Sequence, residues 1–404
     1  MSKDFFVVAG GFSDQNWVNV RTPDIKGKCD GLTVFSIDSD LSHVDEVCQT
    51  HDIESPSTLV ISPDQRFIYT SNETHDYKER GFGGGVTSFT LNKNNGQISF
   101  LNENFAFGSA TAYVTIDRTG KFLLAANCGS KFYVSRYEEI DGELIPVVLR
   151  DEGVVTLFEI LPDGKIGKCL DRLVLEGKGA DPVEHASSHP HSVIIDDDDF
   201  IVIPDKGSDS ICTARLDRKE GKIRKLKVNR HVFASSPRHA AFVPGTDFLL
   251  VQEEFGAHLN SFMINRETGD LTLISRLDTY DESVVSSQGA FCGVDMTRPW
   301  GIDVQVHPNG RWIYTDNTQP AIVQFEIDRS SGELKKLGAF NACLEKMPRG
   351  IQIDKEGKVL AVSGPLDDKL NFFAIDQNTG AVNLVKSVYA PTPTAIRFVY
   401  PEEK

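Results

Sequence analysis

Two short stretches near the middle of the chain carry side chains that could do acid–base chemistry. Residues 189–193 read H-P-H-S-V, and residues 237–242 read P-R-H-A-A-F, with two neighbouring glutamates following at positions 253 and 254. An imidazole can transfer protons near neutral pH, and a guanidinium can stabilise a developing oxyanion. These residue types suit a hydrolytic or proton-transfer site, provided that the fold brings the stretches together.

A repeated strand–turn–strand unit supplies the framework that must position these residues. Each unit has an apolar run, a tight turn and a second apolar run that ends on a polar residue, and it occurs at 59–72, 114–127, 193–205, 240–254, 302–317 and 350–364. A second motif, F-x-I/L-D/N before a turn and a further strand, begins at Phe89, Phe262, Phe325 and Phe373. A period of about 45 to 55 residues, where nothing is inserted, is typical of four-stranded propeller blades.

Six blades are complete in the sequence, and the two ends of the chain supply the parts of a seventh. One C-terminal segment has the pattern of a first strand and three N-terminal segments have that of the later strands, at 395–399, 5–9, 32–37 and 44–48. Joining them closes the ring and removes exposed sheet edges. The sequence therefore predicts an all-β, seven-bladed β-propeller, a single domain over 1–404 whose seventh blade is shared between 1–50 and 390–400.

The propeller geometry places the candidate residues on one face of the ring. Counting back from the first turn of each unit gives one residue per blade around the central channel: Ser57, Ala112, His191, Arg238, Ile302 and Arg349. The ends of the second strands reach the same face and carry Glu73, Lys206, Glu254 and Asn317. The longer insertions also fall there, near 11–30, 73–85, 130–152, 176–188 and 280–299. Loops held on a rigid scaffold often carry function.

The six channel residues are called the ladder below, and the candidate catalytic residues belong to it or lie beside it. A lone histidine is more often structural, but His191 shares the ladder with two arginines, which favours a catalytic role. Arg238 is the candidate oxyanion holder, although it could instead bridge two blades by bonding backbone carbonyls. Glu254 could activate water or hold that arginine, whereas Glu253 should point the opposite way, into blade packing. The predicted substrate-binding residues are His189, Arg349, Arg298, Lys206, Asn317 and Glu73, and His239 flanks the ladder with a lower rank.

Composition limits the partners and the compartment. The formal net charge of -16 argues against nucleic acid or an anionic membrane as the main partner. The seven cysteines are scattered without a C-x-x-C motif, and no stretch has the ~18 apolar residues of a membrane span, so we expect a cytoplasmic protein. Glu73, Asp205 and Asn317 could imitate calcium ligands, but the arginines beside them argue against a central cation. No metal and no cofactor are expected.

The motifs are similar to those of a known family. The sequences H-P-H-S-V, S-P-R-H-A-A-F followed by E-E, and M-P-R-G-I-Q-I-D-K-E-G at 347–357 resemble the seven-bladed propeller lactonases. That family includes bacterial 6-phosphogluconolactonase and fungal 3-carboxy-cis,cis-muconate cyclase. For the muconate cyclase branch, the resemblance implies catalysis by a histidine, two arginines and a glutamate; the histidine falls on His191, the first arginine on Arg238 and the glutamate on Glu254. Thr318 stands where the second arginine is expected, and Glu184 and His185 lie where a further family arginine often precedes the H-x-H motif.

Three functional hypotheses follow from these observations. The first is metal-independent hydrolysis of a sugar lactone or related cyclic ester in the channel mouth, with Arg238 stabilising the oxyanion and His191 or Glu254 activating water. The second is a cycloisomerase or lyase that acts on a carboxylated substrate. The third is a non-catalytic propeller that binds a metabolite or a protein. The sequence leaves the substrate and the oligomeric state open.

Overall fold

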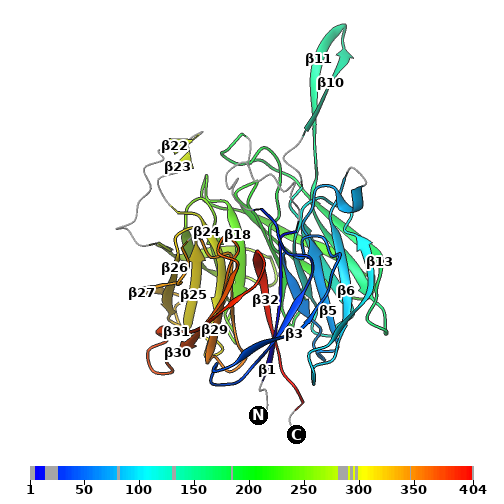
Figure 1. Cartoon of the computed structure of the whole chain (residues 1–404). Coiled ribbons are helices and arrows are strands. Elements are labelled where there is room, and N and C mark those ends of the chain that lie inside the picture. The colour runs from blue at the N-terminus through cyan, green and yellow to red at the C-terminus, as the bar shows by residue number, and fades with distance from the viewer. Residues whose placement is uncertain are drawn as a thin grey trace.

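The computed structural model describes residues 5–13, 26–79, 82–129, 133–182, 185–280, 290–291, 294–295, 299–345 and 347–402. Seven four-stranded antiparallel sheets are arranged as the blades of a ring (Figure 1). The predicted all-β seven-bladed propeller is confirmed. Among the residues described, the only helical segment is the short 3-10 turn η1 (Tyr77–Glu79), and no helix is long and apolar enough to cross a membrane.

Six blades are built from strands in chain order, with the first strand of each nearest the axis. Blade one contains β4 (Leu59–Ile61), β5 (Phe67–Asn72), β6 (Gly85–Leu91) and β7 (Ile98–Phe105). Blade two contains β8 (Thr111–Ile116), β9 (Phe122–Asn127), β12 (Gly153–Ile160) and β13 (Ile166–Leu175). Blade three contains β14 (Ile194–Ile195), β15 (Phe200–Asp205), β16 (Ser210–Asp217) and β17 (Lys222–Arg230).

The remaining consecutive blades follow the same plan. Blade four contains β18 (Pro237–Phe242), β19 (Phe248–Glu253), β20 (His258–Ile264) and β21 (Leu271–Asp278). Blade five contains β24 (Gly301–Val306), β25 (Trp312–Asn317), β26 (Ala321–Ile327) and β27 (Leu334–Asn341). Blade six contains β28 (Gly350–Ile353), β29 (Val359–Gly364), β30 (Lys369–Ile375) and β31 (Val382–Tyr389), and the short strands β22 (Ala290–Phe291) and β23 (Val294–Asp295) form a separate pair.

The seventh blade closes the ring with strands from both ends of the chain. Its order is β3-β2-β1-β32, from β3 (Val44–Gln49), β2 (Thr33–Ile37), β1 (Phe5–Gly11) and β32 (Pro393–Val399). The C-terminal strand β32 pairs antiparallel with β1, from Phe6 opposite Val399 to Gly10 opposite Ala395. The predicted closure is therefore confirmed, and Figure 1 shows both ends of the chain emerging on the same side of the ring.

Apolar side chains packed between neighbouring blades hold the ring together. All seven residues of β1 and all six of β15 are buried, because the inner strands have a blade on each face. In one such cluster, Leu124 and Val155 of blade two pack with Ile201 and Ile203 of blade three. The outermost strands are more exposed to water, and in β27 exposed residues alternate with residues that are at least partly buried. This packing fixes the inner strands, whose first residues reach the channel mouth.

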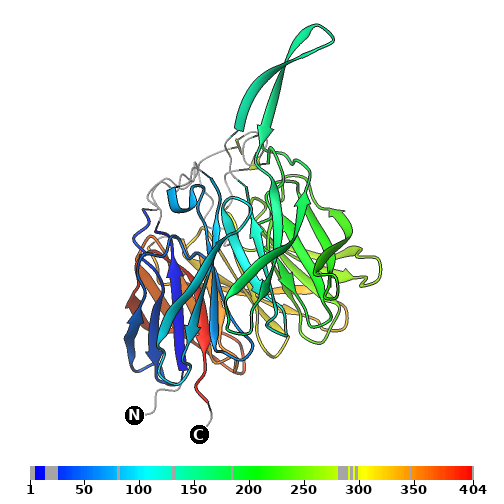
Figure 2. The same ribbon diagram turned by 90° about the vertical axis from the view of Figure 1, so that its right-hand side faces the viewer.

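A long hairpin interrupts blade two between β9 and β12. Strands β10 (Tyr133–Ile140) and β11 (Glu143–Arg150) pair from Tyr133 opposite Arg150 to Ile140 opposite Glu143. The two loop residues, Asp141 and Gly142, have φ angles of 55° and 83°, as a type I′ turn requires. The predicted insertion near 130–152 is this hairpin, which projects from the face of the ring opposite to the chain ends (Figures 1 and 2).

Candidate active site

A narrow cavity on the ring axis is lined by residues from all seven blades. Five of the six ladder positions predicted from the sequence contribute to its wall, namely Ser57, Ala112, His191, Arg238 and Arg349. The sixth, Ile302, contributes its carbonyl oxygen, which accepts a 2.6 Å hydrogen bond from Arg238 Nη1. Thr394 of β32 lines the cavity from the seventh blade. The fold therefore brings together residues that lie far apart in the sequence.

Arg238 is held by several contacts at the channel mouth. It is the second residue of β18 and is 4% exposed. Its Nε donates to Glu254 Oε2 at 2.9 Å, and its Nη1 also lies 3.3 Å from His239 Nε2. Within the described parts of the chain, Nη2 has no hydrogen-bond partner. Arg238 thus bridges two blades through a backbone carbonyl, as one interpretation of the sequence proposed. Its Nη2 group is still available to donate hydrogen bonds to an anionic atom.

Glu254 balances the charge of two cations. Lys206, which follows β15, places its Nζ 3.3 Å from Glu254 Oε1 and 3.4 Å from Oε2, while Arg238 contacts Oε2 from the other side. Burial alone would raise the pKa of this carboxyl, but the charges of Lys206 and Arg238 outweigh it and lower the pKa to about 2. Glu254 is therefore ionised at neutral pH, and its oxygens are held by cations. This arrangement suits a group that positions Arg238 better than one that accepts a proton.

His191 is a buried imidazole among positive charges. It lies just before β14 with its ring centroid 5.3 Å from that of His239. Burial, together with the charges of Arg238 and Lys206, holds its pKa well below the ordinary value of 6.5. Its Nδ1 is buried without a hydrogen-bond partner, and neither ring nitrogen has one among the residues described. A neutral imidazole with unused nitrogens can accept a proton from a water molecule.

Arg349 and Glu73 complete the charged wall of the cavity. The guanidinium of Arg349 lies 5.0 Å above the ring centroid of Phe12. Burial and the charge of Arg238 lower the pKa of Arg349 to about 10, so this side chain remains a cation at neutral pH. Glu73 follows β5 and is buried at the mouth, with its amide donating to Ser55 O at 3.0 Å. The mouth therefore combines cations from blades three, four and six with carboxylates from blades one and four.

Two residues predicted to bind substrate are engaged in holding the backbone. The ring Nδ1 of His189 contacts the carbonyl oxygen of Cys128, and the His189 amide donates to Asp205 Oδ1 at 2.7 Å. Asn317 donates to Thr279 O and accepts from the Gln319 amide at 2.7 Å. These contacts favour a positioning role for both residues. Arg298, also predicted to bind substrate, lies outside the residues described.

Asn317 belongs to a set of asparagines that end the second strands of several blades. Asn72 at the end of β5 donates to Glu54 O at 2.6 Å, and Asn127 at the end of β9 donates to Val154 O at 3.2 Å. Each side chain satisfies backbone groups where the chain leaves the sheet. The recurrence of asparagine at this place in the repeated unit was the signal in the sequence for a structural role. Thr318, the next residue, accepts a 2.9 Å hydrogen bond from the Trp300 amide through its Oγ1.

The sequence did not predict a polar network that lies at the channel cavity. His239 Nδ1 lies 2.8 Å from Asp303 Oδ1, and the Asp303 amide donates to Asp316 Oδ1 at 2.7 Å. Burial and the nearby charge of Asp303 raise the pKa of Asp316 well above 3.8, which favours its protonated form. Asp303 and Gln305 alternate on the inner strand β24 and both line the cavity. That alternation was the available signal, since positions two apart on a strand share a face.

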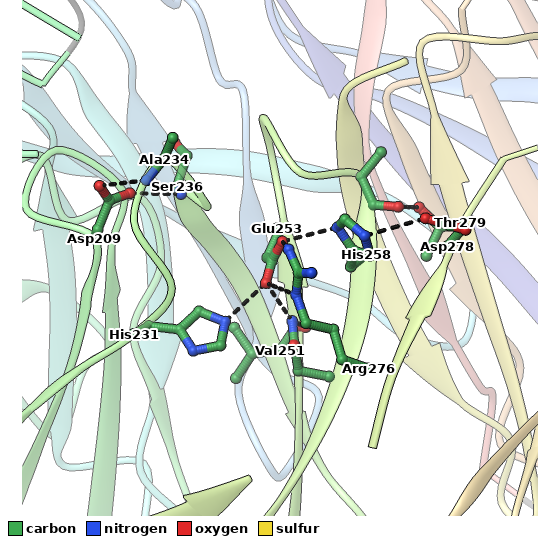
Figure 3. A network of polar contacts seen from close by, with 12 residues as sticks. Asp209, His231, Ala234, Ser236, Val251, Glu253, His258, Arg276, Asp278 and Thr279 are labelled. Atoms are coloured by element: carbon green, nitrogen blue, oxygen red, sulfur yellow. Dashed lines mark hydrogen bonds and ion pairs between the residues drawn. The ribbon is translucent and has the colours of Figure 1, made fainter. Parts of the chain in front are cut away.

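Glu253 lies next to Glu254 in sequence but belongs to a separate buried network (Figure 3). It contacts His231 at 2.8 Å, His258 at 3.0 Å and Arg276 at 2.9 and 2.7 Å. Burial opposes the charge, but these partners outweigh it and hold the pKa of Glu253 below its ordinary 4.5. The two carboxylates therefore point to different sides of the strand end, as the sequence predicted.

Replacing Glu253 with glutamine is expected to lower the free energy of unfolding by about 3–5 kcal/mol, because it removes the buried carboxylate that pairs with Arg276 and accepts hydrogen bonds from its other partners. Because the pKa of Glu253 is lower in the folded state, its contribution is present above about pH 4.5 and is lost as the pH falls below that value. Denaturant unfolding at pH 7 measures the loss, with the exposed Glu267→Gln in the same blade as control. A loss below about 1 kcal/mol would show that the network does not stabilise the blade.

Comparisons with known proteins agree with this architecture. A family model described as "Lactonase, 7-bladed beta-propeller" matches residues 15–398. The 6-phosphogluconolactonase of Bacillus subtilis (strain 168) is 22% identical over 378 residues, covering 93% of this chain and 96% of the relative. The 6-phosphogluconolactonase of Formosa agariphila is 23% identical over 357 residues, covering 87% and 90%.

A solved structure shares the whole fold. The periplasmic gluconolactonase of Pseudomonas aeruginosa superposes with a TM-score of 0.80 at 20% sequence identity, covering 98% of this chain and 99% of that one. The blades, the closure of the ring and the family model thus point to one group of proteins. The chain belongs to the seven-bladed β-propeller lactonase family.

Proposed function

We propose that this protein is a lactonase that hydrolyses a sugar lactone or related cyclic ester at the channel mouth without a metal ion. The observation that carries the proposal is the neutral imidazole of His191 in the same cavity as Arg238, whose partner Glu254 also contacts Lys206. The 6-phosphogluconolactonases and the gluconolactonase named above support it, because their names describe enzymes that act on sugar lactones.

With His191 and Arg238 in these positions, the lactone is hydrolysed in two steps. His191 takes a proton from a water molecule as the water oxygen attacks the lactone carbonyl carbon. The carbonyl oxygen becomes an oxyanion, which Arg238 stabilises through its charge and its available N–H groups. The ring C–O bond then breaks, and the departing alkoxide takes the proton from the His191 imidazolium. The product is a hydroxy acid, which ionises near neutral pH and releases one proton to the solution.

The other charged residues of the mouth have supporting roles. Arg349, Lys206 and Glu73 are assigned to substrate binding, because they reach the mouth from three different blades. His189 and Asn317 position the backbone, and Arg298 remains a prediction for substrate binding. Hydrolysis is favoured over the cycloisomerase or lyase hypothesis, since Thr318, where the resemblance places a second cyclase arginine, is bonded to the Trp300 backbone. The non-catalytic hypothesis offers no use for an unpaired neutral imidazole beside a cation.

A screen for proton release tests the proposed reaction. The purified protein is mixed with phosphorylated and unphosphorylated sugar lactones in a weakly buffered indicator solution, kept slightly acidic so that spontaneous ring opening is slow. At least one lactone is expected to release protons faster than the buffer control. Arg224→Met, which replaces an exposed residue on the outer strand of blade three, serves as the control variant. It should release protons at the wild-type rate. No acceleration with any lactone would contradict the proposal.

Removing metal ions is expected to leave the rate unchanged. The proposed steps use only side chains of the chain itself, so prior dialysis against a strong chelator should not alter kcat/KM. Within the described residues, no group of three or more His, Cys, Asp or Glu side chains is arranged to hold a metal ion. Loss of activity on dialysis, restored by adding back a divalent cation, would show that the proposed chemistry is incomplete.

We also propose that the protein works in a reducing compartment such as the cytoplasm. Six cysteines in the described residues are free, and Cys29, Cys128 and Cys212 are buried as thiols. Burial raises the pKa of the Cys128 thiol to about 12, so it stays protonated near the site.

A further inference from the structure

The hairpin of β10 and β11 stands away from the ring with little protection from water (Figures 1 and 2). The two strands form a sheet of their own, so each has one open edge. Eight large apolar residues on it are between 39% and 71% exposed: Tyr133, Val134, Tyr137, Ile140, Leu144, Ile145, Val148 and Leu149. An isolated two-stranded ribbon is only marginally stable in water, and open apolar edges are usually paired or covered. The hairpin is therefore built to meet another surface.

The two open edges differ in their ability to pair. Strand β11 contains Pro146, which has no backbone N–H to donate. Strand β10 reads Y-V-S-R-Y-E-E-I, without proline or glycine and with four β-favouring apolar or aromatic residues. The edge of β10 is thus the one suited to accept a further strand.

The sequence of β10 is complementary to itself when two copies run antiparallel about Tyr137. In that register Arg136 lies opposite the partner's Glu138, and Val134 lies opposite the partner's Ile140. The two Tyr137 rings meet at the two-fold axis. Opposite charges and apolar or aromatic pairs directly across an antiparallel ladder stabilise it. Within one chain the Arg136 and Glu138 side chains already share a face at 2.5 Å and are 59% and 39% exposed, so both can be reached by a partner.

An apolar groove at the base of the hairpin fits the same register. It is lined by Phe82, Phe105, Phe107, Tyr133, Val134 and Leu149, and the Phe82 and Phe105 rings stack at 5.9 Å. Pairing about Tyr137 carries the tip of the partner's hairpin to the base of this one. The partner's Ile140 then lies opposite Val134, a residue of the groove. Pairing along the edge therefore brings an apolar residue of the partner's hairpin to the apolar groove.

We propose that two copies of this chain form a two-fold symmetric dimer in which the β10 strands pair antiparallel about Tyr137. The two hairpins then make one four-stranded sheet, and each tip covers the groove of the other copy. A two-fold dimer uses the same surface on both subunits, as a self-complementary strand requires. The inference concerns assembly and does not depend on the proposed lactonase activity.

Charge reversal combined with mixing tests the register. The wild type is expected to sediment at twice the chain mass of 44.7 kDa. Arg136→Glu places like charges opposite each other at both symmetry-related pairs, as does Glu138→Arg, so each variant alone should sediment as a monomer. An equimolar mixture of the two variants should recover the dimer, because every glutamate then faces an arginine of the other chain. Neither variant chain has its own Arg136–Glu138 attraction, so recovery reports the contact between chains.

Three results would overturn the proposal. These are a wild type that is monomeric at all concentrations, single variants that remain dimeric, and a mixture that stays monomeric although both variants unfold at the wild-type temperature. The matched control is Arg224→Glu on the outer strand of blade three, which should dimerise as the wild type does. Dimers that survive both single changes would indicate that another surface joins the copies.

Discussion

Arg238→Met is expected to lower kcat/KM for the lactone substrate by about 10²–10³-fold, because it removes the donor that faces the developing oxyanion. In the native site this guanidinium is fixed by its contacts to Glu254 and to the Ile302 carbonyl, so its remaining N–H groups are held ready without reorganisation. Steady-state kinetics on folded protein, checked by thermal unfolding, measures the change.

Arg238→Lys separates charge from geometry in the same experiment. A lysine keeps the positive charge but cannot bond Glu254 and the blade-five carbonyl together as the planar fork does. We expect it to recover only a small part of the lost activity. The exposed Arg224→Met controls for the general effect of losing an arginine. If folded Arg238→Met kept more than about a tenth of the wild-type kcat/KM, the oxyanion role would be wrong.

His191→Asn is expected to reduce kcat by about 10²–10⁴-fold through loss of the general base. The pH dependence gives a second readout. Only the neutral imidazole accepts a proton, and its pKa is held well below 6.5 by burial and nearby cations, so wild-type kcat/KM should stay constant from neutral pH to below 6.5 and fall only in more acidic solution. Because the pKa of His191 is lower in the folded protein than in the unfolded chain, its contribution to folding stability is complete above about pH 6.5 and declines as the pH falls.

The pH dependence of the residual activity of His191→Asn identifies the general base. Its acidic decline should disappear if His191 is the group that titrates. An unchanged acidic decline would transfer the role to another group, with Glu254 as the first candidate, since the sequence left the choice between them open. Glu254→Gln distinguishes the two, because it removes the counter-charge of Arg238 and Lys206 and should lower both stability and activity.

Much of the fold could be predicted because its rules are local. The alternation of apolar residues and the turn before each second strand recur in every blade, so the strands and the closure by β32 and β1 follow from the sequence. The same count along each repeat predicted one residue per blade at the channel. His191, Arg238 and Arg349 do line one cavity, as that count predicted. The place of a residue in one repeat predicts where the equivalent residue lies in the next blade.

Pairing between side chains of different blades was much harder to predict. Nothing in the spacing of Lys206 and Glu254 indicates that they meet, since that contact depends on side-chain directions at the mouth. Asn317 has the position of a site residue, yet its contacts are those of a strand cap. The insertion near 130–152 contains Asp141-Gly142, a dipeptide typical of a two-residue hairpin turn, and both residues have the positive φ angles of that turn.

In the proposed reaction, water attacks a lactone carbonyl at the channel mouth. The most direct test runs the reaction in water enriched in ¹⁸O, with the lactone that the proton-release screen identifies, and locates the label by mass spectrometry after subtracting the uncatalysed reaction. Hydrolysis as described here predicts one ¹⁸O atom in the product carboxylate and none in the released hydroxyl. A product formed without ¹⁸O, as a cycloisomerase or lyase would give, or ¹⁸O found in the hydroxyl, would contradict the account.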